Sequence, residues 1–328
     1  MKSFAALTLV VCLFAAVPVL ADIEGAWTAA LDEKKPGRLY MNITRGRMHQ
    51  NGSAMPVTSF SGLTAAQIGA ATMTPVNFAM RREAGTITYE GTFRNGKGAG
   101  QFTFASNRGY IDAVRGLGIE FSLGRKHKRD QGTDEDSLFT LALHDVSTAF
   151  IKTMIAEGYR VALEDYLSMR IFDITPEYIR EMRSLGFRDI SHDELVASRI
   201  HKVTPAYVRE MRAAGWDLSL DELQSSRIHG ATPAFAEEMR RLGYGNLDHD
   251  DLVSFRIHRV TSELIAQMRK LGYDKLTADQ LVSMRIHRVT PEFIQELEEA
   301  GYVKVPVDKL ISMRIHGIDA KFIKKMAE

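Results

Sequence analysis

Apolar and polar positions alternate with a period of two in the N-terminal part of the chain, between residues 22 and 124. The apolar members of the clearest runs are Leu39, Met41 and Ile43, then Val76, Phe78 and Met80, then Ile87 and Tyr89, then Phe102 and Phe104. This alternation is typical of antiparallel strands with one buried face. We therefore predict five to seven strands in a small meander, sandwich or partial barrel, with a short helical turn near Leu63–Ile68.

A tight hairpin is predicted within this β-rich part, between segments 86–93 and 99–105. The dipeptide Asn95-Gly96 lies between them, and it favours the two-residue turn that joins antiparallel strands. The stretch that begins at Gly91 also imitates the opening of a phosphate-binding P-loop. However, Gly98 stands where a P-loop needs Ser or Thr, and a strand pattern follows where the helix N-terminus should face the phosphates. We therefore interpret the stretch as a hairpin.

The C-terminal two thirds of the chain repeats with a period of 28 or 29 residues. An Arg-Ile-His triplet, or its variant with Phe, marks the units at Arg170, Arg199, Arg227, Arg256, Arg285 and Arg314. A glycine follows each of the first five after 16 residues, at Gly186, Gly215, Gly243, Gly272 and Gly301, so length changes fall in the loop after the glycine. Packed segments of constant length joined by variable loops are typical of structural repeats.

Each unit predicts two short helices. The first begins at Thr-Pro, as at Thr175-Pro176, where the threonine caps the helix and the proline suits its first turn, and it ends at the glycine. The second begins with a capping box such as Ser191 and Glu194. Because a hairpin this small cannot bury its apolar face alone, neighbouring units must stack. We predict an α-solenoid of about seven two-helix repeats over residues 134–328, and hence an α+β multidomain chain.

Two further segments complete the predicted organisation. Residues 1–21 contain Lys2, an apolar run and the cleavage pattern Val19-Leu20-Ala21, which together predict a signal peptide and an exported protein, either periplasmic or secreted. The charged segment 125–133 predicts a linker between the β-rich domain, residues 22–124, and the repeats. No later segment has 18 uninterrupted apolar residues, which predicts a mature chain without a membrane span.

Composition and charge narrow the classes of function. The chain has 42 Lys and Arg and 41 Asp and Glu, and Lys2 belongs to the predicted signal peptide. A neutral balance argues against bulk attraction to nucleic acid or to an anionic membrane. The single cysteine, Cys12, also lies in the signal peptide, so we expect neither disulfides nor thiol chemistry in the mature chain.

A histidine follows the Arg-Ile pair in most repeats, at His201, His229, His258, His287 and His316, with His144 earlier and Phe172 in its place once. Such a row suggests a metal array. Stacked helices lie about 8–10 Å apart, however, whereas a ligand nitrogen must lie about 2.1 Å from zinc. We therefore interpret the histidines as structural and predict no metal ion and no other cofactor.

Two rows of arginine recur. The arginine ladder, at the end of each second helix, is placed where a cation complements the helix dipole and donates to free carbonyls; with the histidines we interpret it as structural, and it comprises Arg170, Arg199, Arg227, Arg256, Arg285 and Arg314. The second arginine row lies three residues before the glycines, at Arg183, Arg212, Arg240 and Arg269. It is the candidate partner-binding row, and a solvated face is the alternative.

The unit Arg-Ile-His-x-Val-Thr-Pro-x-Phe/Tyr-Ile-x-x-Met-Arg-x-x-Gly-Tyr, repeated over residues 134–328, resembles a repeat of bacterial exported proteins. It also resembles the C-terminal repeat extension of membrane metallopeptidases of the β-lactam-sensing antirepressor type. The peptidase half of those proteins, with its membrane helices and zinc motif, has no counterpart in this sequence. The resemblance therefore does not imply peptidase activity.

No catalytic constellation stands out in the sequence, which has no Gly-x-Ser-x-Gly motif. We expect a non-enzymatic exported scaffold that binds an unknown protein or peptide through the surface of the repeats, without a nucleic acid partner. The alternative is an envelope ligand sensor, in which the β-rich domain binds a small molecule or glycan and the repeats serve as a spacer.

Overall fold

The computed structural model describes residues 22–45, 48–123 and 133–327. The predicted signal peptide lies outside the described residues, and so does the predicted linker apart from Thr133. The chain divides into two compact units, with the boundary between Ile171 and Phe172. The first unit therefore contains the β-rich part together with the first helices of the array, and the second contains the remaining repeats.

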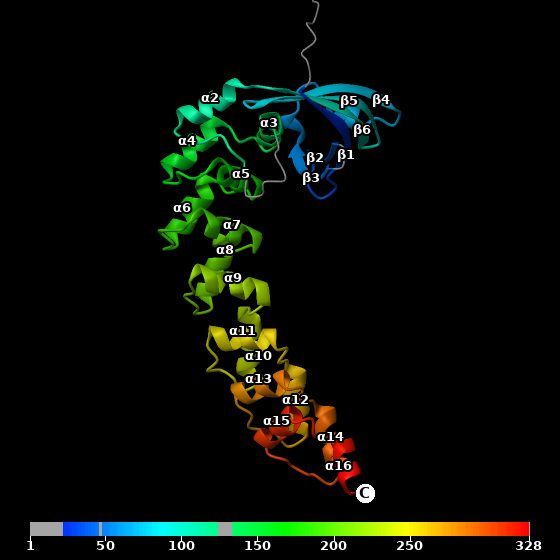
Figure 1. Cartoon of the computed structure of the whole chain (residues 1–328), viewed down its shortest axis with the longest axis vertical. Coiled ribbons are helices and arrows are strands. Elements are labelled where there is room, and N and C mark those ends of the chain that lie inside the picture. Colours follow the sequence, from blue (N-terminus) through cyan, green and yellow to red (C-terminus); the bar gives the residue numbers. More distant parts are fainter. Residues whose placement is uncertain (1–21, 46–47, 124–132, 328) are drawn as a thin grey trace, which may run out of the picture. The chain divides into compact units, whose positions relative to one another are not determined.

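The first unit contains a six-stranded antiparallel sheet with the strand order β3-β2-β1-β6-β5-β4 (Figure 1). The strands are β1 Ile23–Leu31, β2 Arg38–Arg45, β3 Met48–Pro56, β4 Thr74–Arg82, β5 Gly85–Arg94 and β6 Lys97–Ser106. The prediction of five to seven antiparallel strands is confirmed. Alternate side chains enter the core as expected, because Leu39, Met41 and Ile43 are buried while Tyr40 between them is half exposed.

Aromatic side chains fill the inner face of the sheet. Trp27 packs edge-on against Phe78 and Tyr89, and its indole Nε1 donates to the carbonyls of Glu90 and Gln101 at 3.2 and 3.0 Å. A buried indole with both its ring and its N–H satisfied anchors neighbouring strands at one point. The sheet is therefore held by its own core.

The local elements of this part follow the turn chemistry of the sequence. Asn95 and Gly96 have φ of 48° and 76°, as a two-residue hairpin turn requires, and β6 begins directly after them. The hairpin is confirmed and the P-loop resemblance is superficial. The predicted helical turn is α1, Ala65–Gly69, which Thr64 and Gln67 close with a capping box; the 3₁₀ turn η1 spans Val57–Ser59.

One helix of this part was not predicted. Helix α2, Gly109–Gly116, follows β6, and the Tyr110 hydroxyl donates to the carbonyl of Val146 at 2.5 Å. The helix is only eight residues long and has a glycine at each end, so the sequence pattern does not indicate it. Its place in the fold comes from the buried tyrosine that ties it to the array.

Fourteen helices follow in residues 133–327, which makes seven pairs and confirms the predicted repeat series (Figure 1). We name them by their motifs. The Thr-Pro helices are α4 Thr148–Ala156, α6 Pro176–Ser184, α8 Pro205–Ala213, α10 Pro233–Arg241, α12 Ser262–Lys270, α14 Pro291–Glu299 and α16 Ala320–Ala327. The Arg-Ile helices are α5 Leu163–Ile171, α7 His192–Ile200, α9 Leu220–His229, α11 His249–Ile257, α13 Ala278–Ile286 and α15 Val307–Ile315, and α3 Asp134–Leu143 takes their place in the first pair.

The helix ends form as the sequence predicts. Thr175 accepts a hydrogen bond from the N–H of Tyr178, with Pro176 in the first turn, and the equivalent threonines cap the later Thr-Pro helices. Ser191 and Glu194 form the predicted capping box. The glycines after the Thr-Pro helices have φ between 85° and 96°, the left-handed conformation that ends a helix.

Helix α3 joins the sheet to the array within the first unit. The ring of Phe139 stacks on Phe102 with centroids 5.4 Å apart and meets Phe104 edge-on at 5.3 Å. No single helix in the described ranges is long and apolar enough to cross a membrane; α3 and α4 pass that test only as a pair that bends by 72°. In the second unit the core consists of one apolar layer per repeat, which includes Met182, Met211, Met239, Met268 and Leu297.

Candidate functional site

A row of isoleucines faces solvent on the Arg-Ile helices of the second unit. Each follows the ladder arginine, and each side chain is 49 to 56% exposed; the isoleucine row comprises Ile200, Ile228, Ile257, Ile286 and Ile315. A single exposed isoleucine needs no explanation, but five at one position of five repeats form a continuous feature. Ile171 has the same exposure at the end of the first unit.

The residues around the isoleucine row share its face of the helix. Positions three and four before each isoleucine lie one turn away, and apart from Gln224 they carry small or aliphatic residues, such as Ser254 and Val253 before Ile257. Seven residues before each isoleucine stands an exposed aspartate: Asp193, Asp221, Asp250, Asp279 and Asp308. Three of the isoleucines are followed, two residues later, by an exposed basic residue: Lys202, Arg259 and Arg288. The apolar row therefore runs between an acidic and a basic border.

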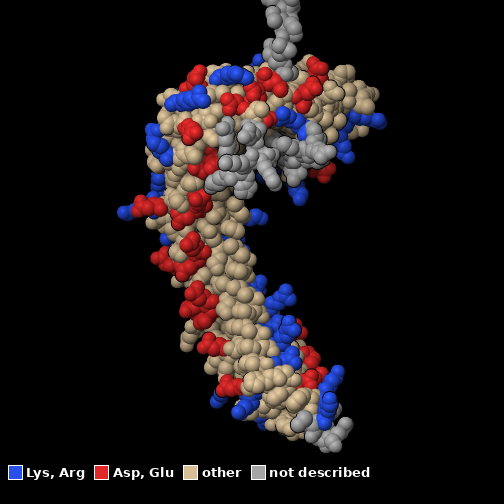
Figure 2. All heavy atoms as spheres, viewed as in Figure 1, with Lys and Arg blue, Asp and Glu red and all other residues tan. Residues whose placement is uncertain are grey.

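The distribution of charge over the second unit is visible in Figure 2. On the face shown, acidic side chains gather along one long edge, basic side chains gather along the opposite edge of the C-terminal repeats, and few charges lie between. A weakly charged band with opposite charges at its borders is suited to a partner that is apolar in the middle and charged at its sides.

The arginine ladder joins each repeat to the previous one. The guanidinium Nε donates to the main-chain carbonyl that closes the preceding Arg-Ile helix, over 2.9 to 3.4 Å; the pairs are Arg170–His144, Arg199–Phe172, Arg256–His229, Arg285–His258 and Arg314–His287. A cation at the end of a helix satisfies a free carbonyl and complements the helix dipole. This contact uses the carbonyl of the histidine position, which explains why Phe172 can replace a histidine.

Most ladder arginines also stack on an aromatic ring of the preceding Thr-Pro helix. Arg256 lies 4.9 Å from the ring centre of Phe235, and Arg227 lies 3.5 Å from that of Tyr207. Arg199 stacks on Tyr178 and forms an ion pair with Asp173 at 2.6 Å. With a ring on one side and a carbonyl at its edge, the ladder arginine has a fixed orientation.

The histidine row lies at the ends of the Arg-Ile helices. His144 is partly buried, and burial together with the charge of Arg170 holds the pKa of its imidazole below the usual value of 6.5. Within the described residues, no group of three or more His, Cys, Asp and Glu is arranged to hold a metal ion.

The second arginine row also has partners within the chain. Arg212 pairs with Asp217 at 3.0 Å, Arg240 pairs with Glu237 at 2.6 Å, and Arg269 donates to the carbonyl of Leu242, which closes the preceding Thr-Pro helix. Arg183 likewise has a partner within the chain. The prediction that this row binds a partner stays untested. Its arginines already have partners within the chain, whereas the side chains of the isoleucine row face solvent.

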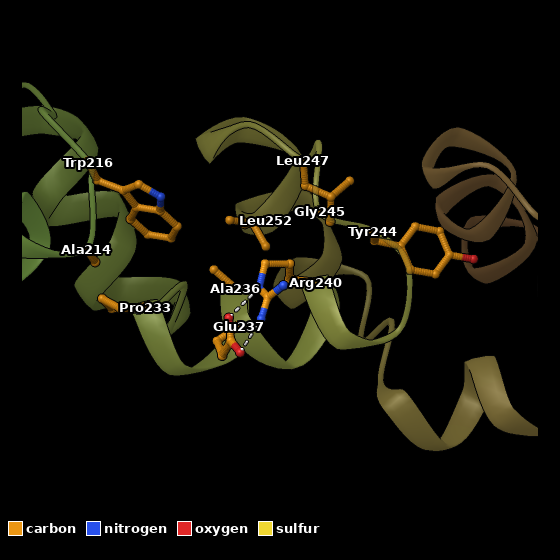
Figure 3. Close-up of a pocket in the computed structure, with 10 residues that line it drawn as sticks. All are labelled: Ala214, Trp216, Pro233, Ala236, Glu237, Arg240, Tyr244, Gly245, Leu247 and Leu252. Carbon is orange, nitrogen blue, oxygen red and sulfur yellow. Dashed lines mark hydrogen bonds and ion pairs between the residues drawn. The ribbon is translucent and has the colours of Figure 1, made fainter.

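A pocket of about 400 Å³ opens between two repeats of the second unit (Figure 3). Its walls come from the loop after α8, from α10, from the loop that leads into α11 and from α11 itself. They include Trp216, Ala236, Arg240, Leu247 and Leu252. Figure 3 shows the indole of Trp216 on the side of Leu252 and Ala236, with the Glu237–Arg240 ion pair across from it. The sequence analysis did not predict this pocket.

A serine, a histidine and an aspartate lie together beside the pocket. Ser226 Oγ and His249 Nε2 are 2.7 Å apart, and His249 Nδ1 lies 3.5 Å from a carboxylate oxygen of Asp250. The order of the groups resembles a hydrolase triad, but Ser226 has no exposed surface, so its hydroxyl cannot reach a substrate. The imidazole serves instead to satisfy a buried hydroxyl.

The isoleucine row was also missed by sequence analysis. The isoleucine is the middle residue of the triplet that defines the repeat, yet an apolar residue at a helical position is normally assigned to the core. One feature of the sequence could have indicated the exposure of the isoleucine. Three consecutive residues of a helix cannot all face the core, so one residue of the Arg-Ile-His triplet had to face outward. Only the packing shows which one does.

No protein-family model, no curated protein and no solved structure matches the chain. The resemblance to exported repeat proteins and to the metallopeptidase extension therefore stays a prediction. The case for a function rests on the geometry of the residues.

Proposed function

We propose that the chain is an exported, non-enzymatic scaffold, and that the helical repeats of its second unit bind an extended segment of a partner protein. The isoleucine row is the observation that carries this proposal. Five half-exposed isoleucines at one repeated position contribute nothing evident to the core. A surface that keeps the same apolar residue outside in every repeat is typical of a contact surface.

The spacing of the repeats fits an extended partner. Packed helices lie about 8–10 Å apart, and a polyproline II segment returns to the same face every three residues, over about 9.3 Å. One apolar side chain in every third position of the partner would therefore meet one isoleucine per repeat. The acidic border of the row favours basic residues on one side of that segment, and Lys202, Arg259 and Arg288 favour acidic residues on the other.

The expected gain is moderate for each contact. Full burial of an isoleucine side chain is worth about 1.5–3 kcal/mol, so covering the exposed half contributes about 1 kcal/mol. Three such contacts change the dissociation constant by about 100-fold. An affinity built in this way grows with the number of repeats that the partner covers.

Selection from a library of 15-residue peptides displayed on phage tests the proposal. The full chain is the bait, and the variant with Ile228→Ser, Ile257→Ser and Ile286→Ser is the counter-bait. We expect selected peptides to carry an apolar residue at every third position, and to bind the triple variant about 100-fold more weakly. Val303→Ser, which removes an exposed apolar side chain outside the row, is the matched control and should bind as the parent does.

Two results would contradict the proposal. One is a set of peptides that bind the triple variant as tightly as the parent, and the other is a set without a three-residue period. Because the three isoleucines are exposed, their replacement should leave the helical signal and the urea midpoint of the chain nearly unchanged.

The envelope sensor is the second reading, and the aromatic core of the sheet weakens it. Trp27, Phe78, Tyr89 and Phe102 occupy the inner face of the sheet, and Phe139 of α3 packs over it. The sensor would be favoured by a glycan or small molecule that raises the melting temperature of the sheet alone. The triple isoleucine variant should then show the same rise as the parent.

Export is part of the proposal and has its own measurement. The apolar run after Lys2 and the pattern Val19-Leu20-Ala21 support it. Intact-mass analysis of the chain from a bacterial periplasmic fraction should give a protein that begins at Asp22. A protein that keeps residues 1–21 and stays in the cytoplasm would contradict export.

A further inference from the structure

The pocket beside Trp216 exists because one repeat lacks a core side chain. At the fourth residue of the Thr-Pro helices, Ile179, Val208, Ile265 and Ile294 are all buried, with at most 2% exposure. The equivalent residue of α10 is Ala236, which lines the pocket. Replacing an isoleucine by alanine removes three carbon atoms, and a packed core does not close fully over such a loss.

The aromatic residue that lines the pocket together with Ala236 is also exceptional. The aromatic position after the glycine holds Phe187, Tyr244 and Tyr273 in other repeats, and tryptophan only at Trp216. The indole supplies the largest flat apolar wall available to a protein, and Leu247 and Leu252 are further apolar residues that line the pocket. The ring also meets His249 edge-on, with the centroids 6.2 Å apart.

The charged residues that line the pocket are Glu237 and Arg240, and they form an ion pair at its rim. Glu237 accepts from Nε and Nη2 of Arg240 at 2.6 and 2.8 Å, and from Nε of Arg241 at 3.0 Å. These bonds lower the pKa of the Glu237 carboxyl to about 2, so it stays ionised at neutral pH. Arg241 lies outside the lining residues, and it shares the Glu237 carboxylate with Arg240, so the three side chains together carry one positive charge. The bonds to Glu237 use Nε and Nη2 of Arg240, which leaves Nη1 to donate to an anion.

We propose that this pocket binds an aromatic carboxylate, with the ring between Trp216 and Leu252 and the carboxylate at Arg240. A volume of about 400 Å³ falls within the range of small-ligand sites, which is about 300–1,000 Å³. The apolar walls pack against the ring, and the guanidinium of Arg240 donates to the carboxylate. This ligand site is separate from the isoleucine row and goes beyond the proposed scaffold function.

Two sources supply the same chemistry: a free aromatic acid, or the C-terminus of a peptide that ends in an aromatic residue. The probes are 3-phenylpropionate for the first and the peptide Gly-Gly-Gly-Phe with a free carboxylate for the second. Their neutral counterparts are 3-phenylpropionamide and the amidated peptide. Binding of the acid alone assigns the site to a small molecule, and binding of the peptide assigns it to a chain terminus.

Fluorescence of the full chain is the readout, because Trp216 forms the wall while Trp27 is buried in the sheet and stays constant. We expect a saturable change with at least one acidic probe, and binding at least tenfold weaker for its amide and for the Arg240→Gln variant. The Ala236→Ile variant introduces the residue of the following repeat, Ile265, and should fold at least as stably as the parent, yet bind at least tenfold more weakly.

If isoleucine disturbs the repeat, Ala236→Val is a second variant that fills the pocket with a smaller side chain. Titration calorimetry is a second measurement, and its signal does not depend on Trp216. No saturable signal with either acidic probe overturns the proposal. Equal affinity of Ala236→Ile and the parent, or of acid and amide, also overturns it. None of these results depends on the isoleucine row.

Discussion

At the scale of single residues, the ladder arginines connect sequence to packing. Most use Nε for a carbonyl of the preceding repeat, and most use the flat face of the guanidinium for an aromatic ring. Lysine cannot combine these contacts, because its ammonium is a compact point charge without a planar face. The repeated arginine is thus explained by geometry as well as by charge.

Arg256 and Arg285 allow the two contacts to be separated. Arg256 donates to a carbonyl and stacks on Phe235, whereas Arg285 donates to a carbonyl at 2.9 Å and has Leu264 at the position of the ring. We expect Arg256→Lys to lower the free energy of unfolding by about 1–2 kcal/mol. Arg285→Lys should cost less by about 0.5–1 kcal/mol, the worth of a cation–π contact. Urea titration followed at 222 nm measures both, and equal costs would contradict the role of the ring.

His144 makes stability depend on pH. Its pKa in the folded chain lies below the value of 6.5, because of burial and the charge of Arg170. As pH falls through 6.5, the unfolded chain binds the proton first, so the free energy of unfolding falls until the pKa of the folded chain is reached. We expect a smaller loss of the urea midpoint between pH 7.5 and 5.5 in His144→Phe, since Phe172 already occupies this position in the next repeat. A pH profile identical to that of the parent would refute the assignment.

At the scale of helices and strands, the helix ends predicted from the sequence agree with the structure. Thr175, Ser191 and the glycine of each repeat adopt the predicted cap geometries, because caps depend on atoms within four residues. Helix α2 and the orientation of the isoleucine row were not predicted. Both depend on contacts with distant parts of the chain, which a local pattern does not contain.

The glycine at the end of each Thr-Pro helix offers a test at this scale. Gly215 has a φ of 89°, and a Cβ added there would meet no atom within 4 Å. Any cost of substitution therefore comes from backbone strain. We expect Gly215→Ala to lower the free energy of unfolding by about 1–2 kcal/mol, and Gly215→Asn to cost less, because asparagine tolerates the left-handed conformation. Thermal melts of both variants measure the difference, and an alanine variant as stable as the parent would exclude strain.

At the scale of the whole molecule, the two compact units have different kinds of core. The sheet pairs strands that are distant in sequence, as in β1 with β6, whereas each repeat of the second unit contacts its neighbours. Stacks of this second kind can open from their ends, because no contact spans the whole array.

The two tryptophans report on the units separately, since Trp27 lies in the sheet and Trp216 in the array. In Trp216→Phe, which introduces the residue found at Phe187, the remaining fluorescence follows the sheet. We expect its urea transition to be sharper and to occur at higher urea than the helical signal at 222 nm, which follows mainly the repeats. Coincident transitions would mean that the two units unfold as one.

The carbonyl acceptor of the arginine ladder has a consequence for how such a chain can change over generations. Because one half of the joint is main chain, it is present whatever side chain stands there, and the arginine that forms the other half recurs in every helix pair after the first. A duplicated or deleted unit would therefore find compatible neighbours at once, without a matching substitution elsewhere. Gene copying can therefore lengthen or shorten this array, whereas a copy that separates Ala236 from Trp216 would lose the pocket that the two residues line.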